Sequence, residues 1–473
     1  MMIDELVEAV PTELLVRTIG GSATVADLTH DSRQVQPGWA FACVVGEHAD
    51  GHRFAGDAVS AGASALIVDR LLAHDVAQLV VTDVRRAIGP LAAAIHGRPS
   101  TKMTMVGITG TNGKTTSTFL LGAILRAAGR NTRELGTLSG VRTTPEAPDL
   151  QRRLAEFVTD HVDATVMEVS SHALALHRVD GTHFDAAIFT NLGRDHLDLH
   201  ESMEAYFRAK ASLFMPQLSD LGVTNIDDPY GRLLLDVAAI PMIGFSAADA
   251  GDVVVGVDRV EFTWRNSRVR VPLGGRFNLM NALAALTAAE AIGIDRATAV
   301  DGIGNCPPVP GRFEVVSDPA RDPFAVVVDY AHTPDGLDEV LAAARMLAGN
   351  GRVIVVFGCG GGRDAEKRPL MGAAAASGAD LVIVTSDNPR DEDPDAIIAA
   401  AVAGIDPTRR TATVTEVLRR AAIGLAIREA RAGDVVVIAG KGHETTQTIG
   451  ETVRPFDDRQ VARELLAELE GCS

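Results

Sequence analysis

The sequence predicts an α/β protein of three domains whose sheets are mainly parallel. Its 473 residues exceed the roughly 250 that a single hydrophobic core usually serves. Two segments rich in proline and glycine, 96–100 and 305–311, cannot continue a helix and divide the chain into 1–97, 98–311 and 312–473. Short apolar runs alternate with helix-length segments inside these domains, as in parallel sheets covered by helices on both faces.

Each domain contributes apolar runs of strand length. The first domain is expected to be a small α/β unit. The expected strands are 40–45, 64–69, 103–109, 164–168, 186–190, 324–329, 352–357, 381–385 and 434–439, and two of the expected helices are 116–128 and 278–292. Polar stretches containing glycine or histidine follow almost every strand after residue 98. Because ligands bind beyond the carboxyl ends of parallel strands, these stretches predict one crevice shared by two domains.

Composition and charge exclude several classes of protein. A net charge of −18 argues against nucleic-acid and anionic-membrane partners, which need clustered Lys and Arg. The four cysteines form no CxxC pair, so neither a disulfide framework nor a cysteine zinc site is expected. The N-terminus lacks the shape of a signal peptide, and no apolar run approaches the roughly 20 residues that span a bilayer. A soluble cytoplasmic protein is expected.

A glycine-rich segment at 107–116, GITGTNGKTT, stands where a predicted strand gives way to a predicted helix. Such loops surround phosphate oxygens with backbone N–H groups, while Lys114 meets β/γ-phosphate charge and Thr115 places a hydroxyl on Mg²⁺. Ile108 departs from the common GxxxxGK(S/T) spacing, and a chance glycine-rich turn is the alternative. The flanking strand and helix favour ATP, bound by Gly110, Thr111, Asn112, Gly113, Lys114, Thr115 and Thr116.

Carboxylate and imidazole groups follow two more strands of the second domain. Glu168 ends one predicted strand, and His196 lies beyond the next between Asp195 and Asp198. These side chains are suited to completing the coordination of Mg²⁺, although a lone His or Glu is more often structural. Lys210 lies on a predicted helix and, from the sequence alone, is an ordinary solvated lysine.

Three polar stretches of the third domain are ambiguous by themselves. Arg363 follows the glycines at 358–362, and Asp387-Asn-Pro-Arg390 follows a strand. Arginine suits bidentate recognition of carboxylates or phosphates, but an ordinary turn with a surface salt bridge is equally compatible. Glu444, in GKGHE, is suited either to binding a substrate ammonium or to capping a helix.

The ordered motifs resemble the Mur ligase family from end to end. They are DSRQVQPG and GEHADGHRF in the first domain, GTNGKTT, TTP, EVSSHAL, TNLGRDHLDLH and YFRAK in the second, and PGRFEVV, VDYAHTPDGL, GCGGGRDAEKRPLMG, SDNPRDEDP and GKGHETTQ in the third. The resemblance implies an N-terminal domain that binds a uridine nucleotide, a central P-loop-type parallel-sheet ATPase domain and a C-terminal Rossmann-like domain.

The activity implied by this resemblance is the ATP-dependent addition of meso-2,6-diaminopimelate to UDP-N-acetylmuramoyl-L-alanyl-D-glutamate in peptidoglycan precursor synthesis. The substrate carboxylate attacks the γ-phosphate of ATP, and the amine then attacks the acyl phosphate. ATP and Mg²⁺ are the implied cofactors, and the two substrates are the implied partners of a monomer. Positioning and charge neutralisation then account for catalysis without an enzyme nucleophile.

The resemblance also assigns roles to individual residues. Lys114, Lys210, Glu168 and His196 are implied to be catalytic, and the metal is implied to be held by Thr115, Glu168, His196 and a carbamylated Lys210. Further nucleotide contacts are implied for Asn281, Arg312, Asp329 and His332. The uridine-linked substrate is assigned to Ser32, Arg33, Thr143, Thr144, Ser170 and Arg178. The amino-acid pocket is assigned to Arg363, Asp387, Asn388, Arg390, Gly440 and Glu444.

Arg390 favours diaminopimelate as the added amino acid. Diaminopimelate carries a distal carboxylate that L-lysine lacks, and an arginine would repel the lysine ammonium. Leu176 and Gly362 depart from residues common in the family, a glutamine and an acidic residue respectively. The same ligase acting on L-lysine or on another acceptor is the nearest alternative. A folylpolyglutamate synthetase is not expected to carry the N-terminal motifs. A catalytically silent nucleotide-binding partner is the alternative from a different class, and the intact Lys114, Glu168, His196 and Lys210 argue against it.

Overall fold

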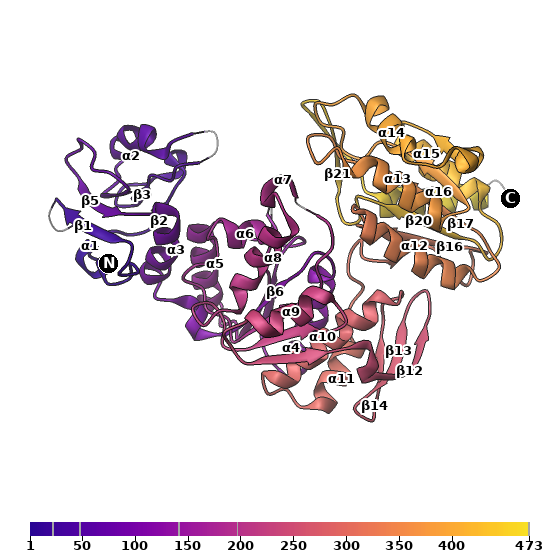
Figure 1. Ribbon diagram of the computed structural model, residues 1–473, viewed down its shortest axis with the longest axis horizontal. Helices are drawn as coiled ribbons and strands as arrows, with labels where there is room; N and C mark the ends of the chain where they lie inside the picture. Colours follow the sequence, from indigo (N-terminus) through magenta and orange to yellow (C-terminus); the bar gives the residue numbers. More distant parts are fainter. Residues whose placement is uncertain (21–22, 47–48, 141, 196, 472–473) are drawn as a thin grey trace.

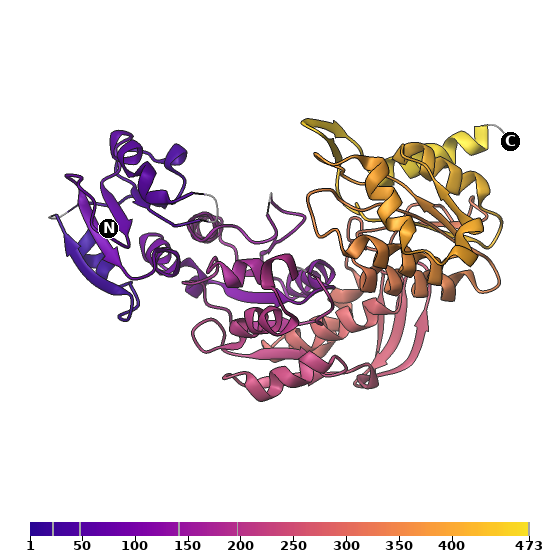
Figure 2. The ribbon, with the colours of Figure 1, turned by 45° about the horizontal axis from the view of Figure 1, so that its top comes forward.

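The computed structural model describes residues 1–20, 23–46, 49–140, 142–195 and 197–471. Three units follow one another along the long axis of the molecule, with the termini at opposite ends (Figures 1 and 2). The main sheets of these units have five, six and six strands in the described part of the chain. The predicted three-domain α/β architecture is therefore confirmed.

The first unit is a small sheet flanked by short helices. Its strands lie in the order β1-β5-β4-β3-β2, and all neighbouring strands are parallel except the pair β1 and β5. The strands are β1 (Leu15–Ile19), β2 (Leu28–Thr29), β3 (Ala40–Ala42), β4 (Ala65–Val68) and β5 (Ala77–Val81). The helices are α1 (Ile3–Val7), α2 (Ala55–Ser60) and α3 (Val84–Ile95).

The central unit carries a fully parallel sheet in the order β11-β10-β9-β6-β8-β7. Its strands are β6 (Thr104–Thr109), β7 (Thr132–Leu135), β8 (Ala164–Glu168), β9 (Ala186–Phe189), β10 (Gly222–Asn225) and β11 (Met242–Phe245). Its helices are α4 (Lys114–Ala127), α5 (Ala147–Thr159), α6 (Ser171–Ala175), α7 (Leu197–His200), α8 (Met203–Ala211), α9 (Pro229–Val237), α10 (Phe277–Ala291) and α11 (Arg296–Gly304). From β6 the chain goes to β7 at one edge, returns to β8 and then crosses to β9, β10 and β11 on the other side of β6. The end of β6 is therefore the switch point where such sheets bind ligands.

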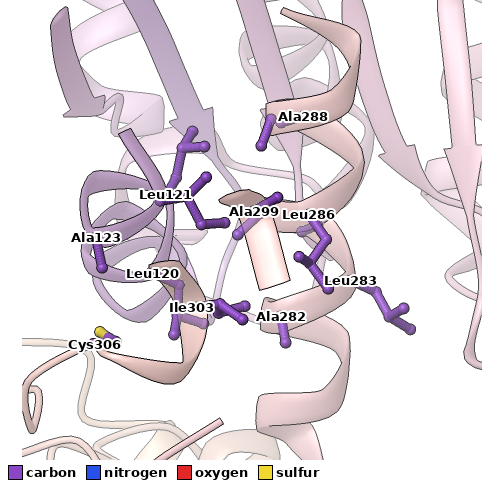
Figure 3. Packing of buried hydrophobic residues seen from close by; sticks show 14 of the residues in the cluster. Leu120, Leu121, Ala123, Ala282, Leu283, Leu286, Ala288, Ala299, Ile303 and Cys306 are labelled. Carbon is purple, nitrogen blue, oxygen red and sulfur yellow. The ribbon is translucent and has the colours of Figure 1, made fainter. Parts of the chain in front are cut away.

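Helices α4, α10 and α11 form the core on one face of this sheet. Leu120 and Leu121 of α4 are completely buried, as are Leu283 and Leu286 of α10 and Ile303 of α11 (Figure 3). Helix α10 is apolar around most of its circumference, which is the composition of a helix enclosed on all sides. This packing fixes the start of α4, where the phosphate loop ends.

An antiparallel sheet in the central unit was not anticipated from the sequence. It has the order β12-β13-β14, with β12 (Ala250–Val255), β13 (Val260–Trp264) and β14 (Ser267–Val271). The turn after β13 has positive φ at Arg265 and Asn266, as two-residue hairpins require. Burial alternates along β13, where Val260, Phe262 and Trp264 face the core. Such alternation is a weaker signal than the continuous apolar runs of the parallel strands.

The third unit is a doubly covered sheet in the order β15-β16-β20-β17-β18-β19, parallel except at its edge strand β15. Its strands are β15 (Glu314–Val315), β16 (Ala325–Asp329), β17 (Val353–Phe357), β18 (Leu381–Val384), β19 (Thr413–Thr415) and β20 (Val435–Ala439), followed by the hairpin β21 (Thr446–Ile449) and β22 (Thr452–Pro455). Its helices are α12 (Pro334–Ala348), α13 (Lys367–Gly378), α14 (Pro394–Ala403), α15 (Arg419–Glu429) and α16 (Asp458–Gly471).

Alternate residues of each central strand of this sheet belong to different cores. Val355 packs in the core that holds α12 to α14, whereas Val356 packs with α15 and α16. Burial on both faces explains why these strands are continuous runs of valine and isoleucine. Among the described residues, no helix is both long and apolar enough to cross a membrane.

Candidate functional site

A cavity of about 780 Å³ lies between the central and third units. Loops that follow strands of both sheets line it, including those after β6, β8, β9, β16, β17, β18 and β20. The shared crevice predicted from the polar stretches is therefore present. The polar stretch after each of these seven strands contributes at least one residue to the wall of the cavity.

The phosphate loop leads from β6 into α4. Gly110 and Gly113 have φ of +152° and +84°, and a Cβ on Gly113 would lie 2.3 Å from the Asn281 Oδ1. Lys114 begins α4, and its Nζ donates to the carbonyls of Gly110 and Thr111 at 2.7 and 2.8 Å. Burial lowers the pKa of Lys114. An incoming triphosphate would offset this cost by facing the ammonium with negative charge.

Lys210 is buried beside this loop, although a lysine on a helix is ordinarily solvated. Its residue is 1% exposed, and its Nζ donates to the Gly110 carbonyl at 2.8 Å. The same Nζ lies 4.6 Å from the centre of the Tyr206 ring. Burial, followed by repulsion from Lys114, lowers the pKa of Lys210 well below its ordinary value. The interpretation of Lys210 as an ordinary solvated lysine, made from the sequence alone, was therefore wrong.

Glu168 and Thr115 form a compact oxygen-rich group at the loop. The Thr115 hydroxyl donates to Glu168 Oε2 at 2.9 Å, and the Thr137 amide donates to Oε1 at 2.9 Å. Arg312, from the third unit, donates to Thr115 Oγ1 at 3.0 Å. A buried carboxylate beside a hydroxyl fits Mg²⁺, which takes few protein oxygens and keeps several waters or phosphate oxygens.

His196 lies outside the described residues, and within those that are described no group of three or more His, Cys, Asp or Glu side chains forms a metal site. The predicted nucleotide residues Asn281, Arg312, Asp329 and His332 all line the cavity. Asp329 accepts hydrogen bonds from the amides of Phe313 and Ala331, both at 2.7 Å, yet its burial raises its pKa.

The residues predicted to hold the uridine-linked substrate are spread from the cavity to the first unit. Thr143 and Ser170 line the cavity. Thr144 lies behind its wall, where its hydroxyl donates to the Glu168 carbonyl at 2.9 Å and accepts from the Ser170 amide at 3.1 Å. Arg178 pairs with Glu146 at 2.9 Å.

Two of the predicted residues lie in the first unit, away from this cavity. Ser32 and Arg33 stand on the short 3₁₀ helix Ser32–Gln34. The Arg33 side chain is 87% exposed and pairs with Asp31. The structure therefore does not bring Ser32 and Arg33 together with the residues that line the cavity.

The predicted amino-acid residues converge at the other end of the cavity. Asn388 donates to Glu444 Oε2 at 2.8 Å and to Asp387 Oδ1 at 3.0 Å. Gly440 has φ of +110°, and a Cβ there would lie 2.7 Å from Asp387 Oδ2. The loop after β18 and the loop after β20 are thus in direct contact.

Arg390 is held in an unusual backbone conformation at this end. Its φ is +52°, its amide donates to the Thr448 carbonyl at 3.1 Å, and its guanidinium donates to the Gly361 carbonyl. Gly362 has φ of +61° and donates its amide to Glu392 at 2.6 Å. Within the described part of the chain no carboxylate pairs with Arg363.

Several lining or supporting residues were missed by sequence reasoning. Asn191 accepts from the Thr111 amide through its carbonyl and from the Asn112 amide through its side chain, each at 2.9 Å. Asp335 of the third unit accepts from the Arg194 amide at 3.1 Å. The TNLGRD stretch predicts a loop, but the order of the strands in the sheet decides which groups form hydrogen bonds with that loop.

Comparisons with known proteins agree with this architecture. Three family descriptions match the chain: "Mur ligase middle domain" at 108–289, "Mur ligase, glutamate ligase domain" at 311–442 and "Mur ligase family, catalytic domain" at 24–96. Among similar curated proteins, UDP-N-acetylmuramoyl-L-alanyl-D-glutamate–2,6-diaminopimelate ligases from Streptomyces avermitilis and Gloeobacter violaceus are 45% and 46% identical, covering 98% and 94% of both chains.

Solved structures show the same arrangement. A ligase structure bearing that same name has 34% identity and a TM-score of 0.67, covering 94% of this chain and 95% of that one. The MurF ligase from Thermotoga maritima in complex with ADP shares the fold, with 19% identity, a TM-score of 0.66 and coverage of 95% and 99%. The phosphate loop, the two facing sheets and these matches define an ATP-dependent ligase that forms amide bonds. The chain belongs to the Mur ligase family.

Proposed function

We propose that this ligase adds meso-2,6-diaminopimelate to UDP-N-acetylmuramoyl-L-alanyl-D-glutamate. The relatives at 45% and 46% identity carry the name of this reaction over nearly their full length. The observation that carries the proposal is the single cavity whose walls hold both the phosphate loop and the loops with Arg363 and Arg390. ATP, the activated carboxylate and the incoming amine can therefore meet without moving between sites.

The proposed reaction has two steps. A carboxylate oxygen of the substrate attacks the γ-phosphorus, and the bond to ADP breaks. The amine nitrogen then attacks the acyl carbon, losing a proton, and the tetrahedral intermediate expels phosphate as the amide forms. Lys114 is proposed to neutralise phosphate charge, because it begins α4 and its ammonium contacts the Gly110 carbonyl of the phosphate loop.

Magnesium is proposed to bind at Thr115 and Glu168, with His196 and a carbamylated Lys210 as further ligands. When bound, the ion would neutralise charge on the phosphate oxygens. Thr137 supports this role, since it fixes Glu168 through its amide at 2.9 Å and its hydroxyl at 3.2 Å. An oriented carboxylate needs no rearrangement when the ion arrives.

Carbamylation of Lys210 is supported by its burial and its low pKa. Only a neutral amine attacks CO₂, and the carbamate forms with release of one proton. The product would carry a negative charge beside Lys114, which would replace repulsion by attraction. We expect activity lost at low CO₂ to return with bicarbonate, and Lys210→Arg to show no such response. Fully active enzyme containing only unmodified lysine by mass spectrometry would contradict the carbamate.

Selection of the amino acid is proposed to rest on both signs of charge. Arg363 and Arg390 flank Gly360, since a Cβ placed on that glycine would lie 3.2 Å from Arg390 Nη1 and 3.8 Å from Arg363 Cγ. Asp387, on the same loop as Arg390, and Glu444, on the loop after β20, supply carboxylates. The distal carboxylate and ammonium of diaminopimelate match this pairing, whereas L-lysine would bring only an ammonium toward the arginines.

The muramoyl-dipeptide part of the substrate is proposed to be held by Thr143, Thr144, Ser170 and Arg178, and its uridine nucleotide to lie at Ser32 and Arg33. The burial of Arg178 lowers its pKa, and Glu146 is its partner in the structure. An anionic substrate would offset the cost of this buried cation.

We also propose domain limits at 1–97, 98–311 and 312–473 and a cytoplasmic location for the protein.

The proposal is tested by supplying ATP, Mg²⁺ and the UDP-linked dipeptide and measuring phosphate release with each amino acid. Release with diaminopimelate but not with L-lysine is expected, and the reverse result would overturn the specificity. Arg390→Ala should abolish discrimination while leaving the KM for ATP unchanged. Arg454→Ala, on the exposed strand β22, is the matched control. Unchanged discrimination in Arg390→Ala would show that another group selects the amino acid.

A further inference from the structure

A buried ion pair lies beneath the amino-acid end of the cavity. The side chains of Arg419 and Asp458 are both 0% exposed. Arg419 Nε donates to Oδ1 at 2.8 Å and its Nη2 donates to Oδ2 at 2.7 Å. These residues begin α15 and α16, and neither lines the cavity. A bidentate pair of this kind fixes the plane of the guanidinium.

The other donors of this guanidinium reach two strand ends. Arg419 Nη1 donates to the Ser386 carbonyl at 3.3 Å, just after β18, and Nη2 donates to the Ala439 carbonyl at 2.8 Å, at the end of β20. Strand β17 separates β18 from β20, so no ladder of backbone hydrogen bonds joins them. The guanidinium is therefore a direct link between the two strand ends across the intervening strand.

The residues that follow these two carbonyls form the amino-acid pocket. Asp387 follows Ser386, and Gly440 follows Ala439. Their loops meet where Asn388 donates to Glu444 at 2.8 Å. Arg419 thus binds the carbonyl one residue before each loop enters the pocket.

We propose that Arg419 and Asp458 form a brace that positions the two loops of the amino-acid pocket. Arg419 is a positioning residue, because it acts through the Ser386 and Ala439 carbonyls rather than by touching substrate. The role rests on the proposed binding of an amino acid at these loops. The phosphate loop lies on the other sheet, and the loops after β18 and β20 carry none of the residues assigned to ATP, so the brace sets the affinity for the amino acid and leaves that for ATP unchanged.

The brace is tested with a variant that removes both charges, Arg419→Met with Asp458→Leu. Removing one partner would strand a buried charge, whereas apolar replacement of both is often tolerated by the fold. The same exchange at Arg352 and Asp434 is the matched control. This pair, 2.7 Å apart, joins the starts of β17 and β20, at the ends of the strands opposite to the cavity. Circular dichroism and thermal melting show whether each of the two variants is folded.

Steady-state kinetics in the full-length chain then separate the substrates. We expect the KM for diaminopimelate to rise at least about tenfold in the Arg419 and Asp458 variant, because small displacements of binding groups are costly, with the KM for ATP within about twofold of wild type. The control pair should change neither value. A folded variant with an unchanged KM for the amino acid, or with equal rises for both substrates, overturns the brace.

Arg419→Lys provides a second test of the brace if the double variant does not fold. Lysine keeps the charge opposite Asp458 but lacks the planar fork that reaches two carbonyls and a carboxylate together. It is expected to raise the KM for diaminopimelate selectively, and an unchanged KM overturns the brace. Wild-type enzyme inactive with diaminopimelate would instead overturn the proposed substrate, and the same comparison is then made with the amino acid that it uses.

Discussion

Asp27 is predicted to pin the first unit to the central unit, with an effect that disappears in acid. Its carboxylate accepts from His96 Nε2 at 3.0 Å, from Arg152 Nε on α5 at 2.8 Å and from the Leu28 amide at 2.7 Å. Burial alone would raise the pKa of Asp27, but these hydrogen bonds lower it from 3.8 to about 2. This fall corresponds to about 2 kcal/mol of stability at neutral pH.

The sign of the pH dependence follows from the lowered pKa. The carboxylate form favours the folded state, so the contribution is complete well above pH 3.8 and is lost as the pH falls through about 2. Asp27→Asn should therefore destabilise the protein by about 2 kcal/mol at pH 7 and by about half as much at pH 3. Urea unfolding at both pH values measures the difference, with Asp75→Asn, at an exposed position, as the control.

Two results would refute this reasoning about Asp27. A loss of stability in Asp27→Asn that is equal at pH 3 and pH 7 would show that the carboxylate charge is not what stabilises the contact. A loss at pH 7 no larger than that of Asp75→Asn would show that the contact between the two units contributes nothing measurable. Either outcome would assign the burial of Asp27 to packing alone.

Three further predictions concern the site and its core. Glu168→Gln should raise the Mg²⁺ concentration needed for half-maximal activity by at least about tenfold, and an unchanged requirement would exclude Glu168 as a ligand. Gly113→Ala should raise the KM for ATP about tenfold, because φ is +84° and the new methyl would lie 2.3 Å from Asn281 Oδ1; normal ATP kinetics would contradict this. Leu121→Ala should lower the free energy of unfolding by about 2–5 kcal/mol, against little change for Leu233→Ala, which is 42% exposed; equal losses would contradict the core assignment.

The parallel sheets were predictable because their chemistry is local. A strand buried on both faces must be apolar throughout, so β17 and β20 stand out as runs of valine and isoleucine. The edge strands and hairpins were not predictable in this way. Strands such as β22 are exposed along their whole length, and pairing with a neighbour, rather than an apolar run, defines them.

The candidate site divides along the same line. The phosphate loop is contiguous, so its glycines, Lys114 and Thr115 were identifiable from spacing. Lys210 was not, because the carbonyl it meets belongs to Gly110, 100 residues earlier. Arg419 gave no signal at all, since its partner lies 39 residues later and its role depends on the order of β18, β17 and β20. Residue type shows what a side chain can do, and topology decides which group it meets.

The charge of the chain illustrates this dependence on topology. A net charge of −18 repels anions at a distance, yet ATP and a uridine nucleotide are both anionic. Salt screens exposed charges beyond about 8 Å at physiological ionic strength, so the overall charge has little effect within a site. There, Lys114, Lys210 and Arg312 converge on the phosphate loop from three elements of two units. Lys210 is buried and Lys114 is half-buried, and desolvation lowers the pKa of both, so the fold has already removed part of their hydration. The folded chain therefore attracts the phosphate anion locally, at this cluster, despite its overall negative charge.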